Sequence, residues 1–110
     1  MDFEVVTRED RCIVCCGKEV TISNSSDFTG VIAEQVKSGK KLVVIDFTKT
    51  SFIDSSGLGA IIANISEIQN RKIQLIFGGC NSIIRKVLEL VGLNRIFPVL
   101  TTMEEADKIR

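Results

Sequence analysis

The segment Asp54-Ser55-Ser56-Gly57-Leu58-Gly59 contains the residues best suited to chemistry. It follows an apolar run and a short polar loop, and it opens a stretch with helical spacing, so we expect a helix to start here. The first backbone N–H groups of a helix bind anions, and the helix dipole favours negative charge there. An exposed serine pair beside free N–H groups therefore predicts a phosphate site. The simpler interpretation is a capped helix start with a turn.

The spacing of this segment does not fit the common catalytic and nucleotide-binding motifs. A nucleophile elbow has glycine two residues before its serine, where Ile53 precedes Ser55. The dinucleotide fingerprint needs glycine or alanine at position 62, which is Ile62, and the Gly-Lys-Ser/Thr of a P-loop is absent. The chain also has no histidine to act as a catalytic base. We expect no enzyme and no cofactor, and we keep as an alternative an enzyme or nucleotide-binding protein that uses the glycine-rich helix start.

The four cysteines favour packing over metal or redox chemistry. Cys12, Cys15 and Cys16 lie in a β-branched stretch that predicts a strand, whereas a redox C-x-x-C normally stands at a loop-to-helix junction. A zinc site needs a second pair of ligands, and only Cys80 remains to supply it. We expect four free thiols, buried or half-buried, and no metal site.

Composition and charge indicate a folded domain without a strongly charged partner. The chain has 14 basic and 14 acidic residues, so its net charge is zero and nucleic acid is not expected as a partner. No apolar run approaches the ~20 residues that span a bilayer. The start of the chain, MDFEVV, lacks the features of a signal peptide. We expect one domain over residues 1–110, in the cytoplasm and without a membrane partner.

The hydrophobic pattern predicts alternating strands and helices. Expected strands are 3–7, 12–16, 19–22, 42–47, 73–77 and 96–100. Expected helices run from Asn24, Ser25 or Ser26 to about 39, over 56–69, from Asn81 or Ser82 to about 92, and after Thr101 or Thr102, either of which can form a capping box with Glu104 or Glu105. A charged turn joins the first two strands into an antiparallel hairpin, and the later strand–helix order predicts parallel strands. The expected fold is α/β, a mixed, mostly parallel sheet of about five strands covered by about four helices.

The stretch 42–62 resembles the anti-sigma factor antagonist family, whose fold is called the STAS domain. The resemblance is carried by an apolar strand that ends at Asp46, by residues 52–59 and by residues 81–93. It continues through Ile96-Phe97 to Glu104-Glu105-Ala106, and so covers about residues 3–108.

The resemblance implies a bacterial signalling protein that binds other proteins and regulates transcription. In this family the unphosphorylated antagonist binds an anti-sigma factor that is also a serine kinase, and so frees a sigma factor. The kinase phosphorylates the serine directly after the Asp, here Ser55, and a serine phosphatase resets the switch. The implied partner-binding residues are Asp54, Ser55, Ser56, Gly57, Leu58 and Gly59. The antagonist is expected to be a monomer or weak dimer.

The chain departs from the family pattern after its second strand, and a second function is also compatible with the sequence. The family usually carries Gly-Glu-Leu-Asp or Gly-Asp-Ile-Asp after the second strand, and its last Asp helps partner contact. Here Thr21 or Ser23 stands where that Asp is looked for, which implies an altered partner-binding rim. The alternative function is a STAS scaffold without a switch, a subunit of a larger stress-signalling assembly that forms large particles.

Overall fold

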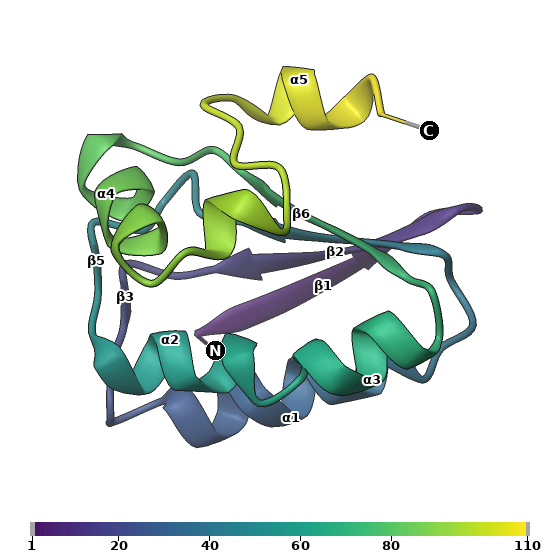
Figure 1. Ribbon diagram of the computed structural model, residues 1–110, viewed down its shortest axis with the longest axis horizontal. Helices are drawn as coiled ribbons and strands as arrows, with labels where there is room; N and C mark the ends of the chain where they lie inside the picture. The colour runs from purple at the N-terminus through teal and green to yellow at the C-terminus, as the bar shows by residue number, and fades with distance from the viewer. Residues whose placement is uncertain (1, 110) are drawn as a thin grey trace.

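The computed structural model describes residues 2–109, in which a mixed sheet lies between helices on both faces (Figure 1). The strand order is β1-β2-β4-β6. Strand β1 (Phe3–Thr7) pairs antiparallel with β2 (Arg11–Cys16). Strands β2, β4 (Leu42–Asp46) and β6 (Gln74–Gly78) run parallel to one another. The expected α/β fold with an N-terminal antiparallel hairpin is confirmed.

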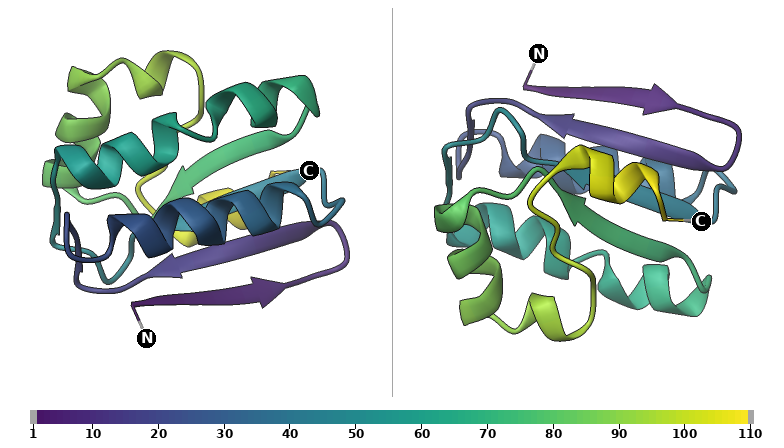
Figure 2. Two further views of the ribbon diagram at one scale, coloured as in Figure 1. Left: turned by 90° about the horizontal axis from the view of Figure 1, so that it is seen from below. Right: turned by 90° about the horizontal axis from the view of Figure 1, so that it is seen from above.

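The helices form two unequal layers. Three of them cover one face of the sheet: α1 (Ser25–Val36), α2 (Ser55–Ile62) and α3 (Ile65–Asn70). In Figure 2, α1 lies beside the line formed by α2 and α3. The short helix α5 (Met103–Asp107) covers the opposite face, while α4 (Ser82–Leu90) and the 3₁₀ turn η1 (Leu93–Arg95) stand at the end of the sheet (Figure 1). Across residues 2–109, none of these helices has the length and apolar character needed to cross a membrane.

Alternation along the strands fills both layers. In β4, Val43 and Ile45 belong to the larger core under α1–α3, while Leu42 and Val44 belong to the smaller core under α5. Both faces of β4 are covered by helices, and this explains why its residues are apolar without interruption from Leu42 to Ile45.

Arg11 holds α5 on the smaller core. Its side chain is only 8% exposed, and its guanidinium donates to the carbonyl oxygens of Ala106 (3.1 Å) and Ile109. It also forms an ion pair with Asp10 at 3.0 Å, and the hydrogen bond to that carboxylate raises the pKa of Arg11. At its start, α5 has the expected capping box, formed by Thr102 and Glu105.

A second, two-stranded sheet places the start of α2. Strand β3 (Glu19–Val20) pairs in parallel with β5 (Phe52–Ile53), which leads directly into the helix. Val20 and Ile53 are buried, but Phe52 is 46% exposed. The two residues of β5 differ in this way because neighbouring residues of a strand point to opposite faces.

The expected helix 56–69 is divided in two at Asn64. The backbone N–H of Asn64 donates to Ile61, one residue closer than in a regular α-helix. Its buried side chain donates to the carbonyl oxygens of Ala60 (3.0 Å) and of Thr29 in α1 (3.3 Å). Asn64 therefore ends α2 and links it to α1.

The expected strand 96–100 is wrong. Ile96 closes the 3₁₀ turn, and only Val99 forms an isolated parallel bridge, with Phe77. Phe77 donates to the carbonyl oxygen of Pro98 (3.0 Å), and Leu100 donates to that of Phe77 (2.8 Å). Pro98 has no N–H to extend this ladder.

Other boundaries differ by a few residues. Strand β2 begins at Arg11, and β3 ends at Val20 rather than at position 22. The chain turns there because the N–H of Thr21 donates to the side chain of Asn24 (2.9 Å). Asn24 stands at the N-cap position of α1, but its side chain makes no capping hydrogen bond to the helix.

Candidate functional site

Asp54 fixes the first turn of α2. It occupies the N-cap position in an extended backbone conformation, and its Oδ1 accepts hydrogen bonds from the N–H groups of Ser56 (2.9 Å) and Gly57 (3.0 Å). Its Oδ2 accepts from the N–H of Ile22 (3.1 Å) in the loop before α1. One carboxylate thus caps the helix and joins it to a loop more than thirty residues earlier in the chain.

The same carboxylate fills the anion site that the sequence predicts. The N–H of Leu58 already donates to the backbone carbonyl of Asp54 (3.1 Å). Within residues 2–109, Ser55 alone in this turn keeps an N–H without a partner. The expectation of free N–H groups is therefore wrong, and an incoming phosphate would face the negative charge of Asp54. The nucleotide-binding alternative loses its physical basis here.

Ser55 and Ser56 differ in accessibility. Ser55 is the first residue of α2 and is exposed, and its hydroxyl has no hydrogen-bond partner in the described part of the chain. Ser56 is half-buried one position later. The hydroxyl of Ser55 is therefore the one that an external active site can reach without unfolding the helix.

The two glycines of the segment have different roles. At Gly57, which is buried, an added Cβ would lie 2.7 Å from Ile53 Cγ1 and 2.9 Å from the carbonyl oxygen of Val20. At Gly59, which is exposed, it would meet nothing within 4 Å. Gly57 lets α2 pack closely on the β3–β5 pair, and Gly59 leaves the outer surface of the helix bare. Leu58 is also buried, so Gly57 and Leu58 support the surface from beneath.

Exposed apolar side chains adjoin this helix start. Ile22, whose N–H donates to the carboxylate of Asp54, is 78% exposed. Phe52, two residues before Asp54, is 46% exposed. The exposure of Ile22 was not predicted, because Ile22 was expected at the end of the strand 19–22. Its position inside a polar run, between Thr21 and Ser23, was the available signal.

The loop around Ile22 is closed by neutral groups. The hydroxyl oxygens of Thr21 and Ser23 lie 2.9 Å apart, and the N–H of Ser23 donates to the hydroxyl oxygen of Thr21 (3.3 Å). Thr21 and Ser23 are the two positions at which the resemblance leads one to look for a single Asp. The rim of the helix start is therefore neutral and apolar on this side.

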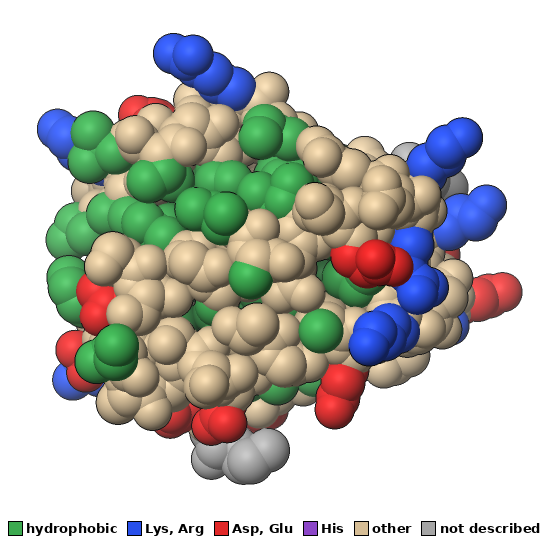
Figure 3. All heavy atoms as spheres, turned by 60° about the horizontal axis from the view of Figure 1, so that its bottom comes forward, with side chains coloured by type: hydrophobic (Ala, Val, Ile, Leu, Met, Phe, Trp, Pro, Cys, Tyr) green, Lys and Arg blue, Asp and Glu red, His purple; other side chains and the backbone are tan. Residues whose placement is uncertain are grey.

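The face of the molecule with α2 has further exposed apolar residues. Figure 3 shows hydrophobic side chains gathered in a band across it. The large exposed hydrophobic residues on α2, on α4 and after them are Ile62, Ile83, Leu90, Val91 and Ile96. Contiguous apolar surface of this kind is typical of protein–protein contacts.

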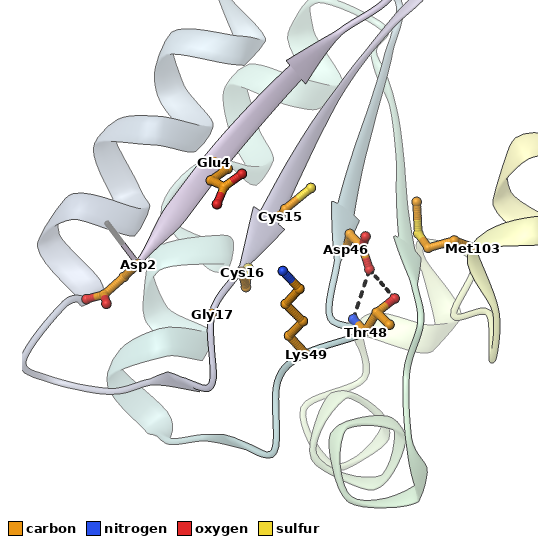
Figure 4. A pocket seen from close by; sticks show the side chains of 9 residues that line it. All are labelled: Asp2, Glu4, Cys15, Cys16, Gly17, Asp46, Thr48, Lys49 and Met103. Carbon is orange, nitrogen blue, oxygen red and sulfur yellow. Dashed lines mark hydrogen bonds between the residues drawn. The ribbon is translucent and has the colours of Figure 1, made fainter.

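A separate hollow of about 480 Å³ lies at the carboxyl ends of β2 and β4 (Figure 4). Cys15, Asp46 and Lys49 are among its lining residues, and Asp46 accepts hydrogen bonds from the backbone N–H and hydroxyl of Thr48. Burial, and then the carboxylates of Asp46 and Glu4, raise the pKa of the Cys15 thiol. Across residues 2–109, no group of three acidic, cysteine or histidine side chains is arranged to hold a metal ion.

All four cysteines are free thiols, as expected, and only Cys15 is more than slightly exposed. Burial raises the pKa of Cys16, and it raises that of Cys80 to about 11. These thiols are held protonated and packed, which is the opposite of the environment that activates a nucleophilic cysteine.

Comparison with known proteins shows the family of the chain. A family model for the STAS domain matches residues 2–106. The chain is similar to BtrV of Bordetella bronchiseptica, named as an anti-sigma factor antagonist, with 28% identity over 94 residues, or 86% of this chain and 81% of the relative.

Solved structures show the same fold. An anti-sigma factor antagonist of Thermotoga maritima superposes with a TM-score of 0.86 at 24% identity, covering 96% of this chain and 92% of the other. The phosphorylated form of the Bacillus cell fate determinant SpoIIAA superposes with a TM-score of 0.77 at 22% identity, covering 98% and 99%.

Proposed function

This chain belongs to the STAS domain family, and we propose that it is an anti-sigma factor antagonist that phosphorylation of Ser55 switches off. In the unphosphorylated state it binds an anti-sigma factor serine kinase through the start of α2, and a sigma factor is released. Phosphorylation of Ser55 by that kinase dissociates the complex, and a serine phosphatase restores the binding form. The chain itself is not the enzyme in this scheme, because the kinase and the phosphatase supply the chemistry.

The exposure of Ser55 carries the proposal. Its hydroxyl stands at the first position of α2, in solvent, beside a carboxylate that already occupies the helix N–H groups. Exposed Gly59 lies one turn along the same helix and adds no side chain, so a partner surface can approach closely. The name of the Bordetella relative supports the same function.

The arrangement around Asp54 favours a switch that acts at the interface. A phosphate adds about 1.5–2 negative charges at pH 7, and a helix start stabilises such charge by only about 0.3–1 kcal/mol. Here the neighbouring carboxylate opposes that gain, and it holds the N–H groups that would bind the phosphate. The phosphate therefore stays in solvent, and we expect no refolding of the free protein.

The cost of phosphorylation falls on the complex. An unpaired, desolvated phosphate in an apolar interface costs several kcal/mol. About 2.8 kcal/mol weakens binding a hundredfold, which is enough for a switch. The exposed side chains of Ile22 and Phe52 beside Ser55 supply the apolar surface that such an interface needs.

The experiment uses the tagged chain with Ser55→Ala and Ser55→Asp variants to capture proteins from a lysate of its source organism. The captured kinase is then purified and recombined with each variant, and binding and ATP-dependent phosphorylation are measured. We expect phosphate on Ser55 only, binding by wild type and Ser55→Ala, and at least a hundredfold weaker binding by Ser55→Asp.

Two variants serve as controls. Ser56→Ala should still be phosphorylated, and Ser66→Asp, which adds the same charge at an exposed position of α3, should still bind. Phosphate on another residue, or unchanged binding by Ser55→Asp, would reject the switch. If every variant retains the same proteins and light scattering shows large particles, the chain is a STAS scaffold instead.

A further inference from the structure

Strand β1 forms an open edge of the sheet, at the outside of the molecule in both views of Figure 2. At one end the N–H of Gly17 donates to the backbone carbonyl oxygen of Asp2 (2.8 Å), and at the other end the N–H of Arg8 donates to that of Arg11 (2.8 Å). Hydrogen-bonded positions alternate along an antiparallel pair, so the even-numbered residues of β1 bond to β2. The N–H and C=O groups of Phe3, Val5 and Thr7 point away from the sheet, without partners within residues 2–109.

This edge lacks three of the usual features that block pairing, although it carries the exposed Glu4. Its register with β2 runs from Phe3 to Thr7 without a bulge, and it contains neither proline nor lysine. Val5 and Val6 are each 40% exposed. Phe3 stacks on Phe28 of α1, with ring centroids 4.9 Å apart. Outside this contact, a groove of about 390 Å³ runs between the start of the strand and α1, and at Gly30 of that helix an added Cβ would meet nothing within 4 Å. Helix α1 therefore leaves the edge accessible.

We propose that two copies of this chain pair along β1, antiparallel and centred on Val5, to form one continuous sheet. In this register Val5 lies opposite Val5 of the second copy, and Phe3 lies opposite Thr7. All three outward residues of each strand then meet outward residues of the other, so every unpaired N–H and C=O group of the edge gains a partner.

Charge and strand length together select this register. Asp2 lies opposite Arg8 of the second copy at both ends of the pair, and Glu4 lies opposite Val6. A slip of two residues in one direction places Glu4 opposite Glu4, and like charges directly opposite each other destabilise a pair of strands. A slip in the other direction places Glu4 opposite Arg8, but it leaves Phe3 opposite Glu9, which lies outside the strand, so the outward groups of Phe3 gain no strand partner.

The inference goes beyond the proposed function and does not depend on it. The start of α2 is carried by the β3–β5 pair, whereas the proposed contact uses the free edge of β1. Ser55 stays accessible in the dimer, so each copy can still bind a partner.

The test is the mass of the protein in solution, measured by sedimentation equilibrium over a range of concentrations. We expect a monomer–dimer equilibrium for the wild type, and a dissociation constant about tenfold higher or more for Val5→Glu and for Val5→Lys, because each places like charges opposite each other. An equimolar mixture of the two variants should recover the dimer. Ser66→Glu on α3 is the control, since it adds the same charge as Val5→Glu at an exposed position away from β1, and it should leave the equilibrium unchanged.

Amide hydrogen exchange gives a second readout at single residues. As the protein concentration rises, the N–H groups of Phe3, Val5 and Thr7 should become protected. Those of Glu4 and Val6, already bonded to β2, should change little. A wild type that stays monomeric at the highest attainable concentration, a Val5→Glu variant as dimeric as the wild type, or protection without this alternation would overturn the proposal.

Discussion

Replacing each of the two glycines in α2 by alanine should change stability in opposite directions. In sequence the two are equivalent, since both lie in Gly57-Leu58-Gly59 inside one helix. Alanine is favoured over glycine in a helix by up to about 1 kcal/mol, because it loses less backbone entropy on folding. Only the surroundings of each Cβ distinguish the positions.

The structure sets the size of the difference. The Cβ of Gly59→Ala points into open space, so the full gain of about 0.5–1 kcal/mol remains. The Cβ of Gly57→Ala would lie 2.7 Å from Ile53 and 2.9 Å from both a methyl carbon and the carbonyl oxygen of Val20. Overpacking of this kind costs about 1–3 kcal/mol, and a backbone oxygen cannot move by rotating a side chain. We expect a net loss of about 1–2 kcal/mol.

The assay is urea unfolding of the wild type and both variants under the same conditions. Gly59→Ala should raise the midpoint and Gly57→Ala should lower it, with unchanged slopes. Because Gly57 also seats α2 on β3 and β5, Gly57→Ala should shift the backbone amide resonances of Val20, Ile53 and Ser55, whereas Gly59→Ala should leave them in place. A Gly57→Ala variant more stable than the wild type would show that β3 and β5 move aside at little cost, and it would refute the claim that they leave no room for a Cβ at position 57.

Three further predictions follow from the contacts described above. Asp54→Ala should lower the free energy of unfolding by about 2 kcal/mol, and Asp54→Asn by about half as much. Asparagine keeps the helix cap, but its amide nitrogen cannot accept the hydrogen bond from the N–H of Ile22. Equal losses of the two variants in urea unfolding would contradict this. Arg11→Met removes the donors to α5 and should cost about 2 kcal/mol, with faster proteolysis of residues 103–109 as the check and unchanged cleavage as the contrary result. Burial raises the pKa of Cys80 to about 11, so only the unfolded thiol loses its proton near pH 9; stability should fall as the pH rises from 9 towards 11, less steeply in Cys80→Ala, and equal slopes would argue against it.

Features that depend on neighbours along the chain were predictable from the sequence. The capping box of α5 needs only Thr102 and Glu105, three residues apart. The hairpin of β1 and β2 and the buried strands β4 and β6 follow from short apolar runs between polar turns. A capped helix start within residues 54–59 belongs to the same class, although the first helical residue is Ser55 rather than Ser56 and the cap is Asp54.

Features that depend on distant segments needed the tertiary structure. Asn64 ends α2 because its side chain is buried against Thr29 of α1. The first turn of α2 is closed to anions because one carboxylate reaches both that turn and Ile22. The segment around Pro98 forms only a single bridge to β6, because proline has no N–H to donate the next hydrogen bond between the two segments.

The pattern of residue types thus determined by itself which elements form, since the hydrogen bonds of a helix turn or a hairpin join residues close in sequence. It did not distinguish Gly57 from Gly59, or show that β1 leaves its outer edge unpaired within residues 2–109. Those properties were decided when the sheet and helices packed together, because the space around an atom and the partners of a backbone group belong to whatever part of the chain arrives beside it.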